Sequence, residues 1–352
     1  MTIFEILYYL GYSIKKRYAL KNQNRLPNKV VSVGNITLGG TGKTPAVIAL
    51  AQEAMKRGLQ PCILTRGYKG KSKGPCFVST GTAPLLDEYQ AGDEALLMAE
   101  KLKGIPIVKA KDRYEAAMFA LSSLASASCL DLFILDDGFQ HWKLYRDINI
   151  LLLDSISPFG NRRLLPLGSL REPINAISRA DIIVITKLEG EILQRAIRPA
   201  LRQRAQSNLQ GAKEDDHIEE IRQYNTEAQI FFAERKPLKF IIPDNKIMSL
   251  EWAKDKSFFS FCGIGNPQSF KETLLSTGIN LKGFRTFRDH YRYSQNDIES
   301  IAKEASRNNA DWIVTTEKDI MRLKGLSLPK QLVSLGIEFH VDKKFFDAVF
   351  GN

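Results

Sequence analysis

A glycine-rich stretch near the N-terminus carries the residue types that hold phosphate groups. The sequence GNITLGGTGKTP occupies residues 34–45 and follows the apolar run KVVSV. A strand, a glycine-dense turn and a helix opening with Lys-Thr form the usual phosphate-binding loop, because backbone N–H groups and the helix N-terminus then face the anion. Lys43 would reach the β- and γ-phosphates, and Thr44 would ligate Mg²⁺. The residues expected to contact nucleotide are Thr37, Leu38, Gly39, Gly40, Thr41, Gly42, Lys43 and Thr44.

This stretch departs at one position from the pattern G-x-x-x-x-G-K-[ST]. Thr37 stands where the first glycine is expected. That glycine serves turn geometry, a role that Gly39 and Gly40 can share. The alternative is a glycine-rich turn that holds no ligand, but Gly-Lys-Thr between a strand and a helix favours nucleotide binding.

A second chemical candidate is FILDDGFQH at residues 133–141. An apolar strand ending in Asp136 and Asp137 matches the second strand of phosphoryl-transfer enzymes, which bears a carboxylate directed at Mg²⁺. The alternative is an aspartate that only caps the strand end. His141 is equally compatible with a structural and a catalytic role.

The third candidate is AGDEALLMA at residues 91–99, where Asp93 and Glu94 open a helix. Helix caps alone explain both acids. A catalytic role requires a partner, and FRDHYRYS at 287–294 offers His290, since a carboxylate–imidazole pair can accept a proton from a hydroxyl. By itself His290 is compatible with a structural role. The arginines expected to surround His290 are Arg285, Arg288 and Arg292.

Several other features give weaker signals. The basic, glycine-rich segment 64–74 could clamp an anionic substrate or form a surface loop. The segment ITKLEG at 185–190 faintly resembles the guanine-reading Asn-Lys-x-Asp motif, but Thr186 and Glu189 replace its key residues. Guanine specificity is therefore not expected. His217 and His340 are interpreted as structural or solvated.

Apolar runs alternate with helix-like segments and predict a parallel sheet covered on both faces. Expected helices are 44–58, 92–103 and 112–127, and expected strands are VVSV, CILT, FILDD and INILLLD. A second series follows, with DIIVITK, FIIP, FFSFCGIG, WIVTT and IEFHV as strands. We therefore expect two α/β domains, residues 1–153 and 154–352, divided near the Pro- and Gly-rich segment 155–173. Residues 205–225 are polar and acidic and predict an exposed insertion.

Composition narrows the possible partners of the 352-residue chain. The net charge of +11 suits an anionic partner such as nucleic acid, a membrane surface or a phosphorylated substrate. The N-terminus is first apolar and then basic, which is typical of a helix at a membrane interface or of a docked helix with a solvated end. It lacks the features of a secretory signal, so we expect the chain to stay in the cytosol. Four widely spaced cysteines argue against a zinc site or a disulfide framework.

Taken together, these motifs resemble the tetraacyldisaccharide 4'-kinases of lipid A biosynthesis. The resemblance covers about residues 1 to 325, and DDGFQH, GNITLGGTGKT and TTEKD are its most specific motifs. In the family order the matching segments are GNITLGGTGKTP, TRGYKG, GDEALL, LDDGFQHWKLYRD, LLPLGSLREP, RADIIVITK, GIGNPQSF, DHYRYS and TTEKD. The family also tolerates a non-glycine residue at the first position of the phosphate loop.

The resemblance implies a P-loop lipid kinase that uses ATP and Mg²⁺. It would phosphorylate the 4'-hydroxyl of a tetraacylated disaccharide 1-phosphate to give lipid IVA, from the cytoplasmic face of the inner membrane, as a peripheral, monotopic protein. The implied fold is a P-loop α/β/α sandwich with a second, smaller α/β/α domain and a cleft between them. By motif, Asp93 and His290 would accept the proton, with Lys43 on the phosphates. Thr44, Asp136, Asp137 and Glu94 would surround the metal.

Two other function classes are compatible with parts of the sequence. A regulatory P-loop NTPase switch would bind partners in a nucleotide-dependent way and have no small-molecule acceptor. A nucleic-acid-binding ATPase would account for the basic charge, but the aromatic-basic motifs of RNA and DNA modules are missing from the sequence. We therefore expect no nucleic-acid partner and infer no obligate protein partner.

Overall fold

The fold is known from a computed structural model that describes residues 2–67, 70, 74–124, 129–186, 209–243 and 246–351. Within these ranges the strands join in one mixed sheet in the order β11-β10-β12-β13-β8-β7-β6-β1-β5-β2-β4-β3, and β9 pairs with β8. The strands are β1 (Lys29–Gly34), β2 (Pro61–Thr65), β3 (Cys76–Thr80), β4 (Pro106–Lys109), β5 (Leu132–Asp136), β6 (Ile148–Asp154), β7 (Ile182–Thr186), β8 (Gln229–Ile241), β9 (Ile247–Ser249), β10 (Ser257–Cys262), β11 (Asn280–Thr286), β12 (Trp312–Thr316) and β13 (Leu332–Val341).

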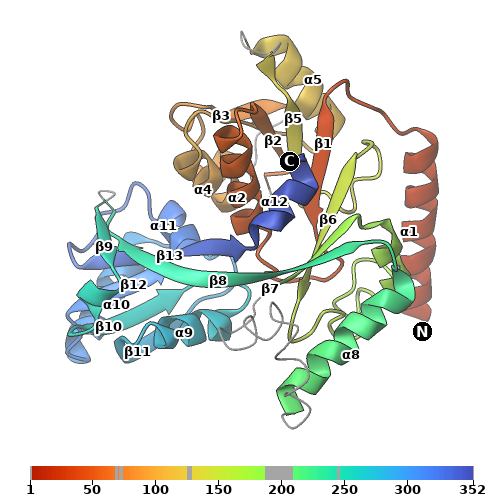
Figure 1. The fold of residues 1–352 in the computed structure, drawn as a ribbon. Helices are drawn as coiled ribbons and strands as arrows, with labels where there is room; N and C mark the ends of the chain where they lie inside the picture. The colour runs from red at the N-terminus through yellow and green to blue at the C-terminus, as the bar shows by residue number, and fades with distance from the viewer. Residues whose placement is uncertain are drawn as a thin grey trace.

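Helices pack around this sheet, as Figure 1 shows. They are α1 (Ile3–Lys21), α2 (Lys43–Lys56), α3 (Glu88–Ala91), α4 (Asp93–Lys101), α5 (Arg113–Ser123), α8 (Leu209–Tyr224), α9 (Pro267–Ser276), α10 (Gln295–Arg307), α11 (Glu317–Arg322) and α12 (Lys343–Phe350), with short 3₁₀ turns η2 (Ile174–Arg179) and η3 (Glu251–Ala253). The expected α/β class is confirmed. The helices expected at 44–58, 92–103 and 112–127 correspond to α2, α4 and α5.

Parallel pairing at the centre of the sheet positions the phosphate loop. β1 lies between β5 and β6 and runs parallel to both. Val33 is in register with Asp136, so the loop after β1 and the acids after β5 emerge at the same sheet edge. This edge is where ligands bind in open parallel sheets.

The strand β8 joins two units of the protein. From Gln229 to Ala233 it runs parallel to β7, and from Ala233 to Ile241 it pairs antiparallel with β13. The apolar core around β1, β2 and β5 extends to Met321, Phe339 and Phe345, and a further core lies around Phe258 and Val314. In Figure 1 this strand crosses the centre of the molecule.

This arrangement does not break the sheet at residues 153/154, where the sequence suggested a division. β6 pairs with both β1 and β7, so residues up to the first half of β8 continue the sheet of the phosphate loop. The Pro- and Gly-rich segment 155–173 is a long connection within that unit. We place the division within β8.

The acidic segment expected at 205–225 is only partly described, because residues 205–208 lie outside the described ranges. Its remainder is helix α8, followed by Asn225. Its C-terminal part is not wholly exposed, since Ile221 is fully buried beside Ile177. The Asn225 amide also donates to the carbonyl oxygens of Ile177 and Ala180, at 2.9 and 2.8 Å. Ile221 and Asn225 thus anchor the end of a mostly polar helix to the rest of the protein.

Four strands, β3, β4, β9 and β11, were not expected from the sequence. β4 has only four residues, and β3 and β11 are the edge strands of the sheet. β11 carries Lys282, Gly283 and Arg285 within NLKGFRT, which hides its period. Edge strands need fewer apolar residues because solvent covers part of their surface.

A core substitution should test the second unit. Phe258 is buried and stacks on Phe240 with ring centroids 5.5 Å apart. We expect Phe258→Ala to lower the free energy of unfolding by about 3–5 kcal/mol, because it leaves a cavity. Urea titration followed by the fluorescence of Trp252, which contacts Phe258, would measure this. Leu275→Ala, at an exposed position on α9, should change the free energy of unfolding by less than about 0.5 kcal/mol. Equal effects of both variants would contradict the assignment of Phe258 to the core.

Candidate active site

The phosphate loop runs from the end of β1 to the first residues of α2. Gly42 precedes the helix with φ 87°, and Gly39 has φ 123°, both in the region that favours glycine. Thr37 forms an antiparallel bridge with Leu170, and Leu38 N–H donates to the Ser169 carbonyl at 2.7 Å. Thr37 therefore sits in extended backbone that needs no glycine, which explains the unusual first position.

The loop is also tied to the neighbouring strands. The Thr186 hydroxyl, at the end of β7, lies 3.0 Å from the Thr41 carbonyl oxygen and 3.2 Å from that of Leu153. Thr186 is fully buried. Thr186 therefore links the end of β7 to the backbone of the phosphate loop at Thr41. Residues 187–190 of the segment compared with the guanine motif lie outside the described residues.

Asp136 and Asp137 follow β5 beside this loop, and they have different surroundings. The Thr65 hydroxyl donates to Asp136 Oδ2 at 3.0 Å. One guanidinium nitrogen of Arg171 lies 2.9 Å from both carboxylate oxygens of Asp137, and Lys43 Nζ lies 3.6 Å from it. Among the described residues, the carboxylate of Asp137 therefore has two basic partners within 4 Å and that of Asp136 has none, although Arg113 Nη2 donates to the Asp136 main-chain carbonyl at 3.2 Å.

The electrostatics of Asp136 and Asp137 follow these contacts. Burial, followed by the nearby charges of Glu94 and Asp137, raises the pKa of Asp136 to about 6. Burial also acts to raise the pKa of Asp137, but the charges of Lys43 and Arg171 hold it below its ordinary value. The negative charge of Asp136 is thus costly in these surroundings. A bound cation would offset that cost, so this carboxylate is suited to bind one.

Glu94 and Thr44 complete the set expected around a metal. Glu94 forms an ion pair with Lys318 of α11, and Thr44 is buried at the start of α2. Within the described ranges, no three His, Cys, Asp or Glu side chains form a cluster that could hold a metal by themselves. Mg²⁺ bound with a nucleotide needs only one or two carboxylates, because phosphates and water supply the other ligands. The residues present fit that mode.

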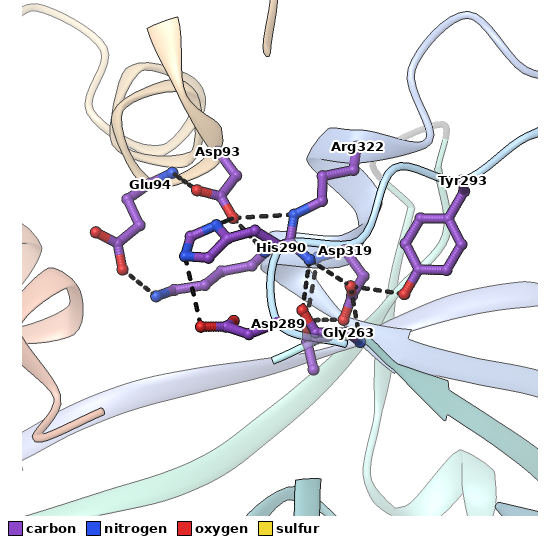
Figure 2. A network of polar contacts seen from close by, with 10 residues as sticks. Asp93, Glu94, Gly263, Asp289, His290, Tyr293, Asp319 and Arg322 are labelled. Atoms are coloured by element: carbon purple, nitrogen blue, oxygen red, sulfur yellow. Dashed lines mark hydrogen bonds and ion pairs between the residues drawn. The ribbon is translucent and has the colours of Figure 1, made fainter. Parts of the chain in front are cut away.

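Asp93 and His290 meet although they are far apart in the sequence. His290 Nδ1 lies 3.1 Å from Asp93 Oδ2, and Asp93 is almost fully buried. Burial alone would raise the pKa of Asp93, but the hydrogen bond to His290 and the charge of Arg322 hold it well below its usual range. Asp93 is therefore a permanent carboxylate at neutral pH. Figure 2 shows this pair with the residues around it.

The arginines expected around His290 do not contact Asp93. Arg285 pairs with Glu304, Arg288 lies over the ring of Tyr291, and Arg292 lies over that of Tyr89. The guanidinium that reaches Asp93 belongs to Arg322, which the sequence reasoning missed. The only sequence signal was its position three residues after Asp319 of TTEKD.

The other three histidines differ from His290, although His141 lines the cavity described next and its Nε2 lies 3.8 Å from Asp112 Oδ1. Burial and the neighbouring Arg113 lower the pKa of His141 to about 4, and its Nε2 accepts from the Arg113 N–H at 3.3 Å. This favours the structural interpretation of His141. His340 is exposed on β13, and His217 lies on α8. Neither of these two lines the cavity described next.

One large cavity of about 1730 Å³ connects these groups. Lys43, Asp136 and His290 line it together with Glu94 and Lys318. The wall continues to α1, which contributes Leu7, Tyr8, Gly11, Tyr12 and Lys15. From the expected anion-binding segment 64–74, Thr65 and Arg66 line the cavity, and residues 68, 69 and 71–73 lie outside the described ranges. The expected cleft is thus present.

Helix α1 docks on this site through one face. The Tyr8 hydroxyl donates to the Arg171 carbonyl at 2.8 Å, and the Tyr12 hydroxyl donates to Glu172 at 2.9 Å. Glu5 on the same face pairs with Arg163. Most of the other apolar side chains of the helix are exposed, among them Ile3, Phe4, Leu7, Leu10 and Ile14. The helix is therefore docked, as one alternative expected, and it still presents an apolar surface, while its membrane association stays a prediction.

Comparison with known proteins extends these observations. The family model for tetraacyldisaccharide-1-P 4'-kinase matches residues 1–351. A protein of Syntrophus aciditrophicus named tetraacyldisaccharide 4'-kinase is 37% identical, with 98% of this chain and 90% of the relative covered. A protein of the same name from Desulfotalea psychrophila is 34% identical, with 94% and 92% covered.

A solved structure agrees with the sequence relatives. LpxK from Aquifex aeolicus, in complex with ATP, superposes with a TM-score of 0.73 at 31% sequence identity. The match covers 99% of this chain and 96% of the other. The agreement extends over both units.

The raised pKa of Asp136 gives a test by stability. A carboxyl whose pKa rises from 3.8 to about 6 on folding binds its proton more tightly in the folded state, so the folded protein loses stability as pH rises through this interval. Asn cannot titrate. We therefore expect Asp136→Asn to gain up to about 3 kcal/mol relative to the parent protein between about pH 4 and about pH 7, without metal or nucleotide.

Urea titrations over this pH range would measure the difference. Asp311→Asn is the matched control, because hydrogen bonds from Ser257 lower the pKa of Asp311, opposite to the change at Asp136. Its difference from the parent protein should stay constant. A constant difference for Asp136→Asn as well would contradict the assigned pKa.

Proposed function

The chain belongs to the tetraacyldisaccharide-1-phosphate 4'-kinase family, and from this premise we propose how its own residues perform the reaction. The protein is a kinase that transfers the γ-phosphate of ATP to the 4'-hydroxyl of the lipid disaccharide in lipid A synthesis. One observation supports the assignment of roles best: the phosphate loop, the acids after β5 and His290 line the same cavity.

The phosphate loop and Lys43 bind the nucleotide in this proposal. Backbone N–H groups of residues 39, 40 and 42–44, at the N-terminus of α2, would face the phosphates, and Lys43 would neutralise charge on the β- and γ-phosphates. Lys43 Nζ lies within 4 Å of Asp137. Bound phosphates would compete with Asp137 for this ammonium group. Arg171 would keep Asp137 paired during that exchange.

Mg²⁺ would be held by Thr44 and Asp136, with Asp137 and Glu94 as outer partners. Asp137 and Glu94 each have a basic partner, whereas among the described residues Asp136 has no basic side chain within ion-pair distance. When bound, Mg²⁺ neutralises the negative charge that develops on the transferred phosphoryl group. Thr65 orients Asp136 for this role through its hydroxyl.

The proton of the 4'-hydroxyl would pass to the His290–Asp93 pair. A neutral histidine that donates from Nδ1 carries its acceptor lone pair on Nε2. Asp93 fixes this tautomer and stabilises the imidazolium that forms when Nε2 accepts the proton. Asp93 itself stays ionised, because its pKa is held low.

Membrane association would bring the lipid to this cavity. No helix within the described residues has the length and apolar character needed to cross a bilayer. α1 exposes apolar side chains and carries Lys15, Lys16, Arg17 and Lys21, and its inner face lines the cavity. We propose that α1 lies in the cytoplasmic surface of the inner membrane, where ATP is available, and guides the acylated disaccharide from the bilayer to His290.

A labelled-phosphate assay tests this proposal. Purified protein, γ-labelled ATP, Mg²⁺ and tetraacyldisaccharide 1-phosphate in detergent micelles should give labelled lipid. Lys43→Ala should abolish the label. Asp93→Ala and His290→Ala should lower kcat by roughly 10²–10⁴-fold with ATP affinity nearly unchanged, because they act on the acceptor.

His340→Ala is the matched control for His290→Ala, since His340 is an exposed histidine outside the cavity. It should retain full turnover. ATP affinity that collapses in Asp93→Ala or His290→Ala with turnover intact at saturation would contradict the assigned roles. Nucleotide binding without lipid product in the parent protein would favour a nucleotide switch.

Vesicle binding tests the role of α1. Leu10 and Ile14 are 51% and 68% exposed on this helix. We expect Leu10→Glu with Ile14→Glu to weaken binding to phosphatidylglycerol-containing vesicles by at least about 10-fold, because apolar area and charge attraction are both lost. Met118→Glu on α5, 43% exposed, is the matched control. Equal cosedimentation of both variants would exclude α1 as the membrane contact.

A further inference from the structure

We propose that Arg322 is the positioning residue that assembles the proton-accepting pair across the two units. This inference rests on the proposed roles of Asp93 and His290. Asp93 belongs to α4 of the phosphate-loop unit, whereas His290 and Arg322 belong to the second unit. Asp93 and His290 can therefore meet only if contacts between the two units hold them in a fixed position at this point.

The contacts of Arg322 satisfy every nitrogen of its guanidinium. Nε lies 3.0 Å from Asp93 Oδ2, and Nη2 also donates to this oxygen. Nη1 donates to Asp319 Oδ1 at 2.9 Å and to the Gly263 carbonyl at 2.7 Å. The side chain is 1% exposed. A buried ion pair with this geometry holds Asp93 in one orientation.

Asp319 anchors the other side of Arg322. It accepts hydrogen bonds from the Thr316 hydroxyl at 2.6 Å, from the Tyr293 hydroxyl at 2.8 Å and from the Gly263 N–H at 3.1 Å. Asp319 is fully buried. Its carboxylate thus has a single position, and Figure 2 shows Arg322 between it and Asp93.

Arg322 also supports His290 through the main chain. The Gly263 carbonyl that accepts from Arg322 also accepts from the His290 N–H at 3.0 Å. His290 has φ 56°, an uncommon conformation for a residue with a side chain, so it requires support from its surroundings. Arg322 therefore reaches both members of the pair, Asp93 directly and His290 through Gly263.

A lysine at this position could not make these contacts. The contacts of Arg322 extend in different directions from the three nitrogens of its planar guanidinium, whereas the ammonium group of lysine has a single nitrogen. The substitution Arg322→Lys would keep a positive charge next to Asp93 and lose the bond to Asp319 or Gly263. The proposal therefore predicts that geometry, beyond charge, is required at this position.

Steady-state kinetics of Arg322→Ala and Arg322→Lys test this role. Both variants should lower kcat by about 100-fold or more, with KM for ATP and lipid within about threefold of the parent values, because misplaced reacting groups slow the chemical step. Added guanidinium at millimolar concentration should restore part of the kcat of Arg322→Ala and leave Arg322→Lys unchanged. In Asp93→Ala, adding Arg322→Ala should cause little further loss, because Arg322 acts through Asp93.

Lys324→Ala is the matched control. Lys324 pairs with Glu100 of α4, so this variant also removes an ion pair between the two units but leaves Asp93 untouched. It should keep kcat within about twofold. Should Arg322→Ala fail to fold, judged by circular dichroism and ATP binding, Arg322→Lys and the double variant with Asp93→Ala decide.

Three results would overturn the proposal. They are a kcat within about threefold of the parent for Arg322→Ala, an equal loss in Lys324→Ala, and a raised lipid KM with unchanged kcat. The last would make Arg322 a substrate-binding residue. The same assays separate this failure from that of the proposed function, because His290→Ala would still lose activity if only the role of Arg322 were wrong. If His290→Ala were fully active, the proton-accepting pair itself would be wrong.

Discussion

The site depends on one strand that pairs with both halves of the sheet. β8 is parallel to β7 as far as Ala233 and antiparallel to β13 beyond it. Backbone hydrogen bonds along this strand therefore join the second unit to the first. Such a continuous ladder is stiffer than a linker of irregular chain. It brings α11 and the segment with His290 against α4, where neither unit alone would present both Asp93 and His290.

Charge pairing is the second constraint on this interface. The carboxylates that line or support the cavity would be costly to bury unpaired. Lys318, Arg322 and Arg171 each neutralise one of them, and two of these bases come from α11 of the opposite unit. Asp136 is left beside the phosphate loop without a basic side chain in ion-pair distance among the described residues. The uncompensated negative charge is thus located where a nucleotide-bound cation would arrive.

Hydrogen bonds also join the N-terminal helix α1 to the site. Tyr8 and Tyr12 donate to the backbone of Arg171 and to Glu172, and Arg171 holds Asp137. A helix that exposes apolar side chains on its outer surface is therefore joined to the phosphate-binding residues by a short chain of hydrogen bonds. In the proposed function, the outer face of α1 would meet the lipid bilayer, and the phosphate-binding residues joined to its inner face would meet the nucleotide.

Local patterns were sufficient to predict the α/β class, the phosphate loop, the acids after β5 and the amphipathic N-terminus, because each of these depends on residues close together in the chain. Residue types could suggest His290 as a partner of Asp93, but only the family resemblance assigned the pair, since no local pattern relates residues so far apart. Only the tertiary structure decided that the sheet continues through β8, that Arg322 rather than Arg285, Arg288 or Arg292 meets Asp93, and that α8 is anchored by Ile221. Those outcomes arise from packing and charge compensation between distant segments, which the order of residues encodes but no local period reveals.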